Sequence, residues 1–512
     1  MPFGLEQRFS RLRPDAFTAA AIVTGYAVAS LLIGYVIALG QPVPIALAFG
    51  LVAGVALLNA LPLVIWTILA GVLLISGPVV MFVPSLEKVG WLFSLFGFFL
   101  TGATILHAAV GRQRFDAPLP MFVVYAVFLF VFGLLSMAYS GGPLMEGVAA
   151  TKRYFQYFGL MFALAIVPFA ARLVIRWWHF LGLIALLQFP FALYQRIVLV
   201  PMREGMPGVD AIDIVVGTME GSLTGGGSSS VMALLLVAAL VYLLSVYREG
   251  VMPARRFALL ATLVVAPLPL GEVKLLVVLV PIAMALTFVD LVRRHPLRFI
   301  LGIVLGLVIL AALGWAYMAI NATPGRAVTP GGDTLERIIE STIAYNFGSV
   351  GYYGTGLNRT SIYPYWFDHH HLSDPVSLLF GHGLGSTYEV RGAANLGHMA
   401  QAHPWMHIGL TAASSVLWDL GILGLVLLIA LYLSAARGAS RLVRHARPGF
   451  DRAFCRTLYV TAVMLLVMLF YSDSPITVPS QQVLMALCFG LIAWRSRSAM
   501  STDGASRERH AA

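Results

Sequence analysis

Long apolar segments follow one another along almost the whole chain, and this pattern limits the fold more than any other feature. A transmembrane helix needs about 20 mostly apolar residues, because the hydrocarbon core of a bilayer is about 30 Å thick. Only 11% of the residues are charged, against about 25% in soluble domains. We therefore predict an all-α polytopic membrane protein. Its fourteen candidate transmembrane helices are 16–39, 43–60, 62–83, 89–110, 117–138, 154–171, 177–199, 229–247, 257–270, 275–290, 299–320, 405–435, 457–471 and 481–494.

The basic residues supply a test of the topology. Cytoplasmic loops of membrane proteins are enriched in Lys and Arg. If the N-terminus is cytoplasmic, alternation of the fourteen segments brings the large arginine clusters to the same side, the C-terminal tail included. These clusters contain Arg8, Arg11, Arg13, Arg112, Arg114, Arg172, Arg176, Arg248, Arg255, Arg256, Arg293, Arg294, Arg298, Arg437, Arg441, Arg444, Arg447, Arg452 and Arg456. The net charge of +10 therefore indicates membrane orientation and not nucleic-acid binding.

Residues 257–290 contain a break. One long helix here would place every later basic loop on the wrong side, whereas two short crossings keep the alternation. Pro267, Pro269 and Gly271 interrupt the pattern between the two halves. We predict that "PLPLGEVKLL" dips into the membrane from the outer side, where irregular backbone typically lines a site or a cavity.

The same alternation divides the chain into four parts. Residues 1–320 carry helices 1–11 with short loops, and residues 321–404 form one large outer loop between helices 11 and 12. Residues 405–495 carry helices 12–14. Residues 496–512 are polar and are predicted to be a disordered cytoplasmic tail.

Charged groups on the outer side are few, and charges at membrane depth are costly enough to mark functional sites. Lys274 stands out because apolar residues follow it and Glu272 precedes it by two positions. It either extends to the lipid headgroups or holds an anionic lipid-linked substrate. The outward basic set is Lys88, Lys152, Arg153, Arg196, Arg203, Lys274, Arg326, Arg337, Arg359 and Arg391.

His403 is the strongest candidate for a catalytic base. It precedes Pro404 and Trp405 at the predicted start of helix 12. Histidine titrates near pH 6.5, the range that suits a general base, although an interfacial histidine with satisfied hydrogen bonds is equally compatible. If both residues are helical, His407 lies on the same face one turn deeper.

Two further stretches allow more than one interpretation. The run "DHHHL" invites a metal site, but three adjacent histidines cannot all face one ion on a helix or strand. A loop that stacks on sugar rings explains Tyr365 and Trp366 as well. The segment "SLTGGGSSS" lacks the lysine of a phosphate-binding P-loop, and we expect its serines to cap the helix that follows.

Several motifs together resemble the O-antigen ligase and Wzy-type polysaccharide polymerase superfamily, which are GT-C-type membrane glycosyltransferases. The family has a histidine opening a late helix, then an acidic residue and a Gly-Leu-Leu-Gly-like run. His403, Asp419 and "LGILGL" match in order. Arg359, Trp366 and "GHGLG" match an arginine, a tryptophan and a glycine-rich turn, and "GTMEGSLTGGGSSS" lies where the family has a Gly-Thr motif. The family often has Ser-Arg-Gly where this chain has "GEVK".

The resemblance implies transfer of a glycan from an undecaprenyl-pyrophosphate carrier to an acceptor hydroxyl at the periplasmic face of the bacterial inner membrane. His403 would remove the proton of the acceptor, and Arg359 and Lys274 would neutralise the leaving pyrophosphate without a metal or other cofactor. The family leads us to expect direct displacement that inverts the anomeric centre. Substrate contacts are expected from Arg203, Arg391, Glu272, Trp366 and Tyr365.

The acceptor distinguishes the alternatives within this class. A polymerase of exopolysaccharide or O-antigen repeats uses another lipid-linked glycan and works beside a chain-length regulator, whereas a ligase uses the lipid A core of lipopolysaccharide. A different class is a flippase for lipid-linked oligosaccharides. Transporters usually carry charges near the middle of the membrane and show repeats, so the charges on one outer loop favour an enzyme.

Overall fold

The computed structural model describes residues 54, 56–86, 89–110, 118–140, 142–204, 206, 211–271, 275–292, 295–321, 356–372, 374–389 and 397–511. The chain divides into two compact units, Met1–Val64 and Ile65–Ala512. The first contributes only residue 54 and residues 56–64 to the described part. The architecture below is that of the second unit.

Every regular element of the described residues is a helix, and this confirms the predicted all-α membrane class. Eight helical segments in this part of the chain are long and apolar enough to cross a membrane. They are Leu61–Phe82 (α3, Leu61–Ala70; η1, Gly71–Ser76; α4, Gly77–Phe82), Pro84–Val110 (η2, Pro84–Leu86; α5, Val89–Val110), Met121–Tyr139 (α6), Ala171–Arg203 (α9, Ala171–Tyr194; η3, Gln195–Leu199; α10, Val200–Arg203), Ser229–Arg248 (α11), Pro296–Ala316 of α14 (Pro296–Asn321), Ala412–His445 (α19) and Phe450–Tyr471 (α20).

The other helices of the described residues are not among these eight segments. The described part of the chain thus has eight candidate membrane-spanning segments, against fourteen predicted for the whole chain. Segment 154–171 contains only the nine-residue helix α8 (Phe158–Ile166), which at 1.5 Å per residue reaches about 14 Å. Segment 16–39 and most of 43–60 lie outside the described residues. The other elements are α7 (Leu144–Phe155), η4 (Ala211–Ile214), α12 (Ala254–Val265), η5 (Leu268–Leu270), α13 (Leu276–Thr287), η6 (Val289–Leu291), α16 (Ile362–His369), α17 (Pro375–Phe380), α18 (His398–Ala402), α21 (Ser474–Thr477) and α22 (Pro479–Ala511).

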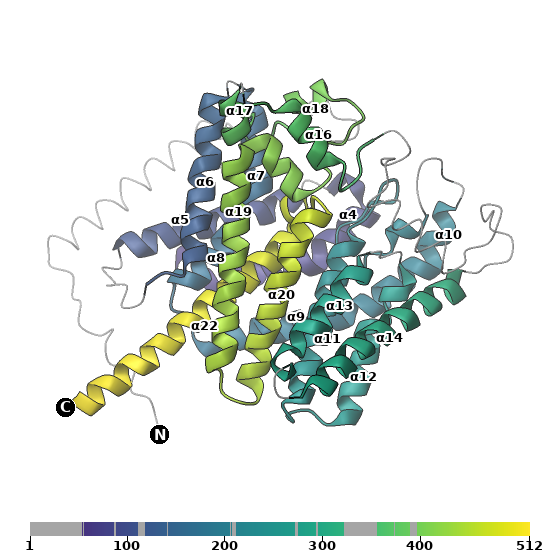
Figure 1. Ribbon diagram of the computed structural model, residues 1–512, viewed down its shortest axis with the longest axis vertical. Coiled ribbons are helices and arrows are strands. Elements are labelled where there is room, and N and C mark those ends of the chain that lie inside the picture. The colour runs from purple at the N-terminus through teal and green to yellow at the C-terminus, as the bar shows by residue number, and fades with distance from the viewer. Residues whose placement is uncertain are drawn as a thin grey trace, which may run out of the picture. The chain divides into compact units, whose positions relative to one another are not determined.

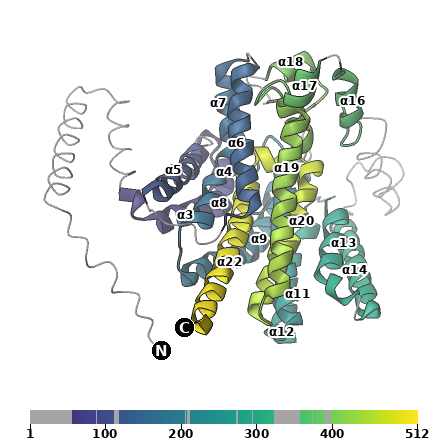
Figure 2. The same ribbon diagram turned by 60° about the vertical axis from the view of Figure 1, so that its left-hand side comes forward.

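Helices α19 and α20 form an antiparallel pair that positions the functional residues, and α6 packs against α19 (Figures 1 and 2). The short helices α16, α17 and α18 gather at the N-terminal end of α19 in both views. The described part of the predicted outer loop, residues 356–372, 374–389 and 397–404, is therefore docked on the helix bundle.

Helix α19 bends at Gly421, which has φ 63° and ψ −165° inside an otherwise helical run. A Cβ atom at this position would lie 2.4 Å from the carbonyl carbon of Leu379. Only glycine combines the left-handed backbone with this close approach. The bend thus lets the C-terminal end of α17 lie directly on α19.

The predicted break in residues 257–290 is confirmed as two short helices, α12 and α13, in place of one long helix. Gly271 lies between them, and a Cβ atom there would approach the carbonyl oxygen of Val215 to 3.0 Å. Residues 272–274 are outside the described part, so the depth of "GEVK" stays a prediction.

Val215 belongs to a buried non-helical segment, residues 215–219. Gln195 accepts hydrogen bonds from the backbone N–H groups of Val216 (2.9 Å) and Gly217 (2.7 Å) and donates one to the carbonyl of Gly217 (2.7 Å). Gln188 accepts from the N–H of Thr218 at 2.9 Å. Irregular backbone at membrane depth requires such internal partners, so the "GTMEG" motif is held by two glutamines.

One local prediction, the capping of α11 by serine side chains, is wrong. Ser228 is the N-cap of α11, but its side chain makes no capping hydrogen bond. Instead, the glycine-rich segment folds back on itself through a bridge between Gly221 and Gly227. Helix α22 continues through the polar tail to Ala511, and the disorder expected of this tail stays a prediction.

Candidate functional site

A polar pocket of about 470 Å³ opens where α11 and α19 begin and α20 ends. Its wall includes charged side chains from elements far apart in sequence, so it is the candidate functional site. The lining residues are Arg153, Tyr154, Asp213, Gly226, Gly227, Ser229, Ser230, Arg359, Thr387, Glu389, His407, Gly409, Leu410, Ser415, Asp419, Tyr471, Ser472, Asp473, Ser474 and Ile476.

The start of α19 fixes one side of the polar pocket. Thr411 and Ser414 form a capping box, in which each side chain accepts the backbone N–H of the other residue at 3.1 Å. The N–H of Ala412 donates to the carbonyl of Ser472 at 2.9 Å. This bond ties the beginning of α19 to the end of α20, so the segments around His407 and Asp473 face the same space.

Two arginines give the polar pocket its positive charge. The guanidinium of Arg153, in the last turn of α7, lies 4.1 Å above the ring of Tyr388. The guanidinium of Arg359 lies 4.2 Å above the ring of Tyr471, and its Nε donates to the carbonyl of Tyr471. Stacking on an aromatic face is a favourable arrangement for arginine, and it fixes the plane of both groups at the wall.

His407 forms an ion-pairing contact inside the polar pocket. Its Nδ1 lies 2.8 Å from Oε2 of Glu389. A carboxylate at Nδ1 favours the tautomer with the proton on that nitrogen, and Nε2 is then the acceptor. The pair therefore has the chemistry of a general base with an orienting carboxylate.

The backbone around His407 is strained. Trp405 has φ 71° and His407 has φ 52°, and they are the only non-glycine residues with positive φ in the described part of the chain. Left-handed backbone is unfavourable for residues with a Cβ, and it concentrates at functional sites where surrounding structure enforces it. Residues 403–411 consequently are not helical, and α19 begins at Ala412, seven residues after the predicted start at 405.

Asp473 adds a carboxyl group that differs from the others. It lies between α20 and α21 and lines the polar pocket. Burial raises the pKa of the Asp473 carboxyl above its ordinary value, and the nearby charge of Arg153 only partly opposes this shift. A carboxyl with a raised pKa holds a proton more readily than an ordinary aspartate does.

The buried carboxylate of Asp419 organises the floor of the polar pocket. Oδ1 accepts from Ser386 Oγ (2.7 Å), Thr387 N (2.9 Å) and Thr387 Oγ1 (3.0 Å). Oδ2 accepts from Tyr154 Oη (2.8 Å) and Gly385 N (3.1 Å). Five donors satisfy this carboxylate, so its role is to anchor the 385–387 turn to α19 and α7.

The "GHGLG" turn is built around this anchor. Gly381, Gly383 and Gly385 all have positive φ, at 75°, 97° and 96°. A Cβ atom on Gly381 would lie 2.5 Å from the carbonyl carbon of Asp419, and one on Gly383 would lie 2.3 Å from Ser140 Oγ. Gly381 therefore allows close packing on α19, and Gly383 allows close packing on the end of α6.

His403 lies in a different environment from the one predicted. It is absent from the wall of the polar pocket. Its Nδ1 lies 2.8 Å from Tyr365 Oη, and its ring packs against His369 and Trp418. Burial, reinforced by neighbouring histidines, lowers the pKa of His403. His407 and Arg359 thus line the same pocket, whereas His403 does not.

The structure places the predicted substrate-binding residues in different environments. Trp366 is fully buried and stacks on His370 in a core with Ile408 and Trp418, so it has no free ring face for a sugar, contrary to the prediction. Tyr365 is half-buried beside His403.

Arg203 is buried, and its Nη2 donates to the carbonyl of Gly225 at 2.6 Å, which braces the loop behind the polar pocket. Lys274, Glu272 and Arg391 lie outside the described residues.

Arg153, Glu389, His407 and Asp473 are pocket residues that sequence reasoning did not select. Arg153 belonged to the outward basic set, and His407 shared a segment with His403. No local pattern marked Glu389 or Asp473.

The histidines of "DHHHL" have different partners. His369 Nδ1 lies 2.8 Å from the carbonyl of Tyr365, and His370 Nδ1 lies 2.8 Å from that of Trp366. His370 Nε2 lies 2.9 Å from His382 Nε2. No group of three or more His, Cys, Asp or Glu side chains in the described part of the chain has a geometry that would hold a metal ion.

The His370–His382 pair is expected to make the outer loop sensitive to acid. Burial lowers the pKa of both rings, that of His382 from 6.5 to about 4. The pair therefore stabilises the fold above pH 6.5, and this contribution is lost as the pH falls toward 4. We expect a loss of about 1 kcal/mol by pH 5, after allowance for solvent screening.

Thermal unfolding of purified protein at pH 7.5 and pH 5 measures this loss. The double variant His370→Gln/His382→Gln should show a smaller decrease in the unfolding temperature than the wild type. An equal decrease in both proteins would contradict the assignment.

No protein-family model matches the chain, and a search of curated proteins finds no similar sequence. The fold and the site together define a helical membrane-embedded protein with a polar pocket at the ends of its long apolar helices. Any more specific function must be argued from the geometry of that pocket.

Proposed function

We propose that the protein is a membrane glycosyltransferase that moves a glycan from undecaprenyl pyrophosphate to an acceptor hydroxyl. The observation that carries the proposal is the polar pocket, which combines Arg153 and Arg359 with the Glu389–His407 pair. A pyrophosphate leaving group needs cations, and an attacking hydroxyl needs a base. Both requirements are met by residues of one pocket.

The reaction is a single displacement. His407 Nε2 accepts the proton of the acceptor hydroxyl, and the hydroxyl oxygen attacks the anomeric carbon of the donor. The bond between that carbon and the pyrophosphate oxygen breaks, and the lipid pyrophosphate leaves with the bonding electrons. Arg153 and Arg359 neutralise the charge that develops on it, while Glu389 stabilises the protonated imidazole.

The position of the polar pocket along the helices favours a periplasmic reaction. The end of α19 and the start of α20 carry the arginine cluster Arg437, Arg441, Arg444, Arg447, Arg452 and Arg456. Such clusters are retained in the cytoplasm. The polar pocket lies at the other ends of these two helices, the side on which exported lipid-linked glycans become available.

Among the enzymes of this class, we favour a polymerase of exopolysaccharide or O-antigen repeats over a ligase. Both would use the same cations and base and would differ in the acceptor. A flippase remains the alternative of another class, and it would move the donor without cleaving it. The experiment below separates transfer from transport.

Removing either pocket arginine is expected to lower donor turnover by about 100-fold, the usual cost of losing one group that stabilises developing charge. Arg153→Ala and Arg359→Ala should show this loss in a purified assay that measures release of undecaprenyl pyrophosphate from a lipid-linked glycan. The lysine variants should retain more activity, because they keep the charge and lose the planar contact.

Arg437→Ala is the matched control, because Arg437 is an exposed arginine at the opposite end of α19. It should turn over the donor at the wild-type rate. Wild-type rates for both pocket variants, or donor movement across vesicles without cleavage, would overturn the proposal.

A further inference from the structure

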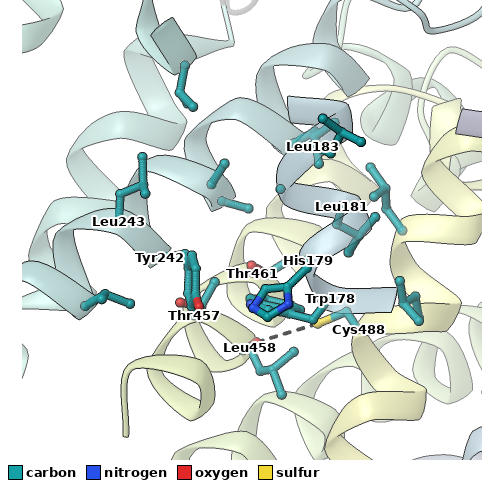
Figure 3. A pocket seen from close by; sticks show the side chains of 18 of the residues that line it. Trp178, His179, Leu181, Leu183, Tyr242, Leu243, Thr457, Leu458, Thr461 and Cys488 are labelled. Carbon is teal, nitrogen blue, oxygen red and sulfur yellow. Dashed lines mark hydrogen bonds between the residues drawn. The ribbon is translucent and has the colours of Figure 1, made fainter. Parts of the chain in front are cut away.

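A second cavity, which we call the apolar cavity, lies among α9, α11, α12, α20 and α22 (Figure 3). Its volume is about 460 Å³, and its wall is almost entirely aliphatic and aromatic. Leu183, Leu235, Leu243, Leu260 and Leu484 are among its lining residues. At roughly 30 Å³ for a group the size of a water molecule, it has room for about 15 methylene-sized groups, which is close to one acyl chain.

One part of the apolar cavity is aromatic and more polar. Trp178, His179 and Tyr242 lie together there, as Figure 3 shows. Phe450 packs edge-on against the rings of both His179 and Tyr242. Aromatic rings with a polar edge are typical of the depth where hydrocarbon meets headgroups. The apolar cavity therefore has the two-part character of a lipid site.

Exposed arginines stand on two of the helices that form the apolar cavity. Arg172 and Arg176 lie seven and three residues before His179 on α9, and Arg256 lies four residues before Leu260 on α12. These spacings place each arginine on the same helix face as a cavity residue. Neither these three arginines nor Arg255 forms an ion pair with another described residue.

The arginines whose side chains the structure describes on α11, α20 and α22 already have partners. Arg248 forms a bidentate bond with Asp290, at 3.0 and 2.8 Å. Arg456 and Arg452 contact Glu249, at 3.1 and 3.8 Å. Among the described side chains of the cavity helices, the exposed arginines of α9 and α12 are therefore the positive charges available to an anion beside the apolar cavity.

We propose that the apolar cavity binds one anionic phospholipid, with an acyl chain among the leucines and the phosphate beside the arginines of α9 and α12. Basic positions between transmembrane helices on the cytoplasmic side are known to bind anionic headgroups. The site is separate from the polar pocket, because it lies toward the opposite ends of α11 and α20.

A space-filling variant tests the acyl-chain part. Gly182 lines the apolar cavity, and a Cβ atom there would meet no heavy atom within 4 Å. Gly182→Phe should fill the space without a backbone clash. Gly102→Phe is the matched control, because Gly102 is also helical and also open around its Cβ, but it does not line the apolar cavity.

Each protein is reconstituted in nanodiscs that contain equal amounts of phosphatidylglycerol and phosphatidylcholine. After extraction into detergent, retained lipid is measured by native mass spectrometry. Wild type and Gly102→Phe should retain one phosphatidylglycerol, and Gly182→Phe should retain about tenfold less. Equal retention by Gly182→Phe and Gly102→Phe would overturn the proposal.

A second pair of variants tests the headgroup part and leaves the cavity wall unchanged. Arg255→Ser/Arg256→Ser should reduce the preference for phosphatidylglycerol over phosphatidylcholine by about tenfold, since each arginine near a membrane surface contributes to the attraction of an anionic lipid. Arg437→Ser/Arg441→Ser, on exposed positions of α19, should leave the preference unchanged. Equal retention of both lipids by the wild type would overturn the assignment of an anionic headgroup.

Discussion

Replacing His407 with alanine is expected to lower glycan transfer by about 100- to 10,000-fold, the range that general-base catalysis contributes. His407 lines the polar pocket with Arg359, and Glu389 lies 2.8 Å from its Nδ1. His403→Ala is expected to have a much smaller effect, because His403 packs against Tyr365 outside the pocket wall.

The measurement is the rate of undecaprenyl pyrophosphate release by the two purified variants, at equal amounts of folded protein. Glu389→Gln should give an intermediate rate, because glutamine keeps a hydrogen bond to Nδ1 but loses the charge that stabilises the imidazolium. If His403→Ala is as slow as His407→Ala, the choice between the two histidines is wrong.

Replacing Asp419 with alanine is expected to cost about 3–5 kcal/mol of stability. The change leaves five donors without an acceptor, from Tyr154, Gly385, Ser386 and Thr387. All of these residues are buried, so leaving their donors without a partner carries a desolvation cost. The expected result is an unfolding temperature well below that of the wild type in detergent.

Asp419→Asn should lose less, because its amide oxygen accepts some of these bonds while its NH₂ group faces the remaining donors. Asp368→Ala is a suitable control, since Asp368 is an exposed carboxylate on α16. An unfolding temperature of Asp419→Ala within error of the control would show that the turn does not depend on this anchor.

Hydropathy predicted the membrane class and the break between α12 and α13, because both depend on local composition. A run of apolar residues is costly anywhere but in lipid or a core, and Pro267, Pro269 and Gly271 interrupt helices for local reasons. Helix length was harder to predict. The apolar run at 154–171 contains the short helix α8, which is buried by protein on nearly all sides and does not need to cross a bilayer.

The candidate site was predicted only in part. Arg359 was selected as an outer-loop cation that matches the arginine of the resembled family, and it lines the polar pocket. The choice of His403 assumed a helix from residue 405, whereas left-handed residues Trp405 and His407 redirect the chain before α19. Tertiary packing brings Glu389 and Asp473 to the pocket wall. The spacing of residues in the sequence does not indicate such packing.

The motif residues also show that the order of motifs in a sequence does not reveal their tertiary contacts. "GHGLG" and Asp419 were recognised as separate features in a fixed order along the chain. Their physical connection is a set of hydrogen bonds across more than thirty residues, from Ser386 and Thr387 to Asp419. Likewise, Trp366 resembled a sugar-stacking residue, but complete burial gives it a packing role.

The wall of the polar pocket contains residues from Arg153 to Ile476, and its floor needs the 385–387 turn bonded to Asp419. During synthesis, the ribosome must therefore make almost the whole protein before this space is enclosed. If the polar pocket is periplasmic, as proposed, the segment that carries Arg359 must also cross the membrane before it reaches the pocket wall. A nascent chain, or one truncated before Ile476, therefore lacks a complete polar pocket.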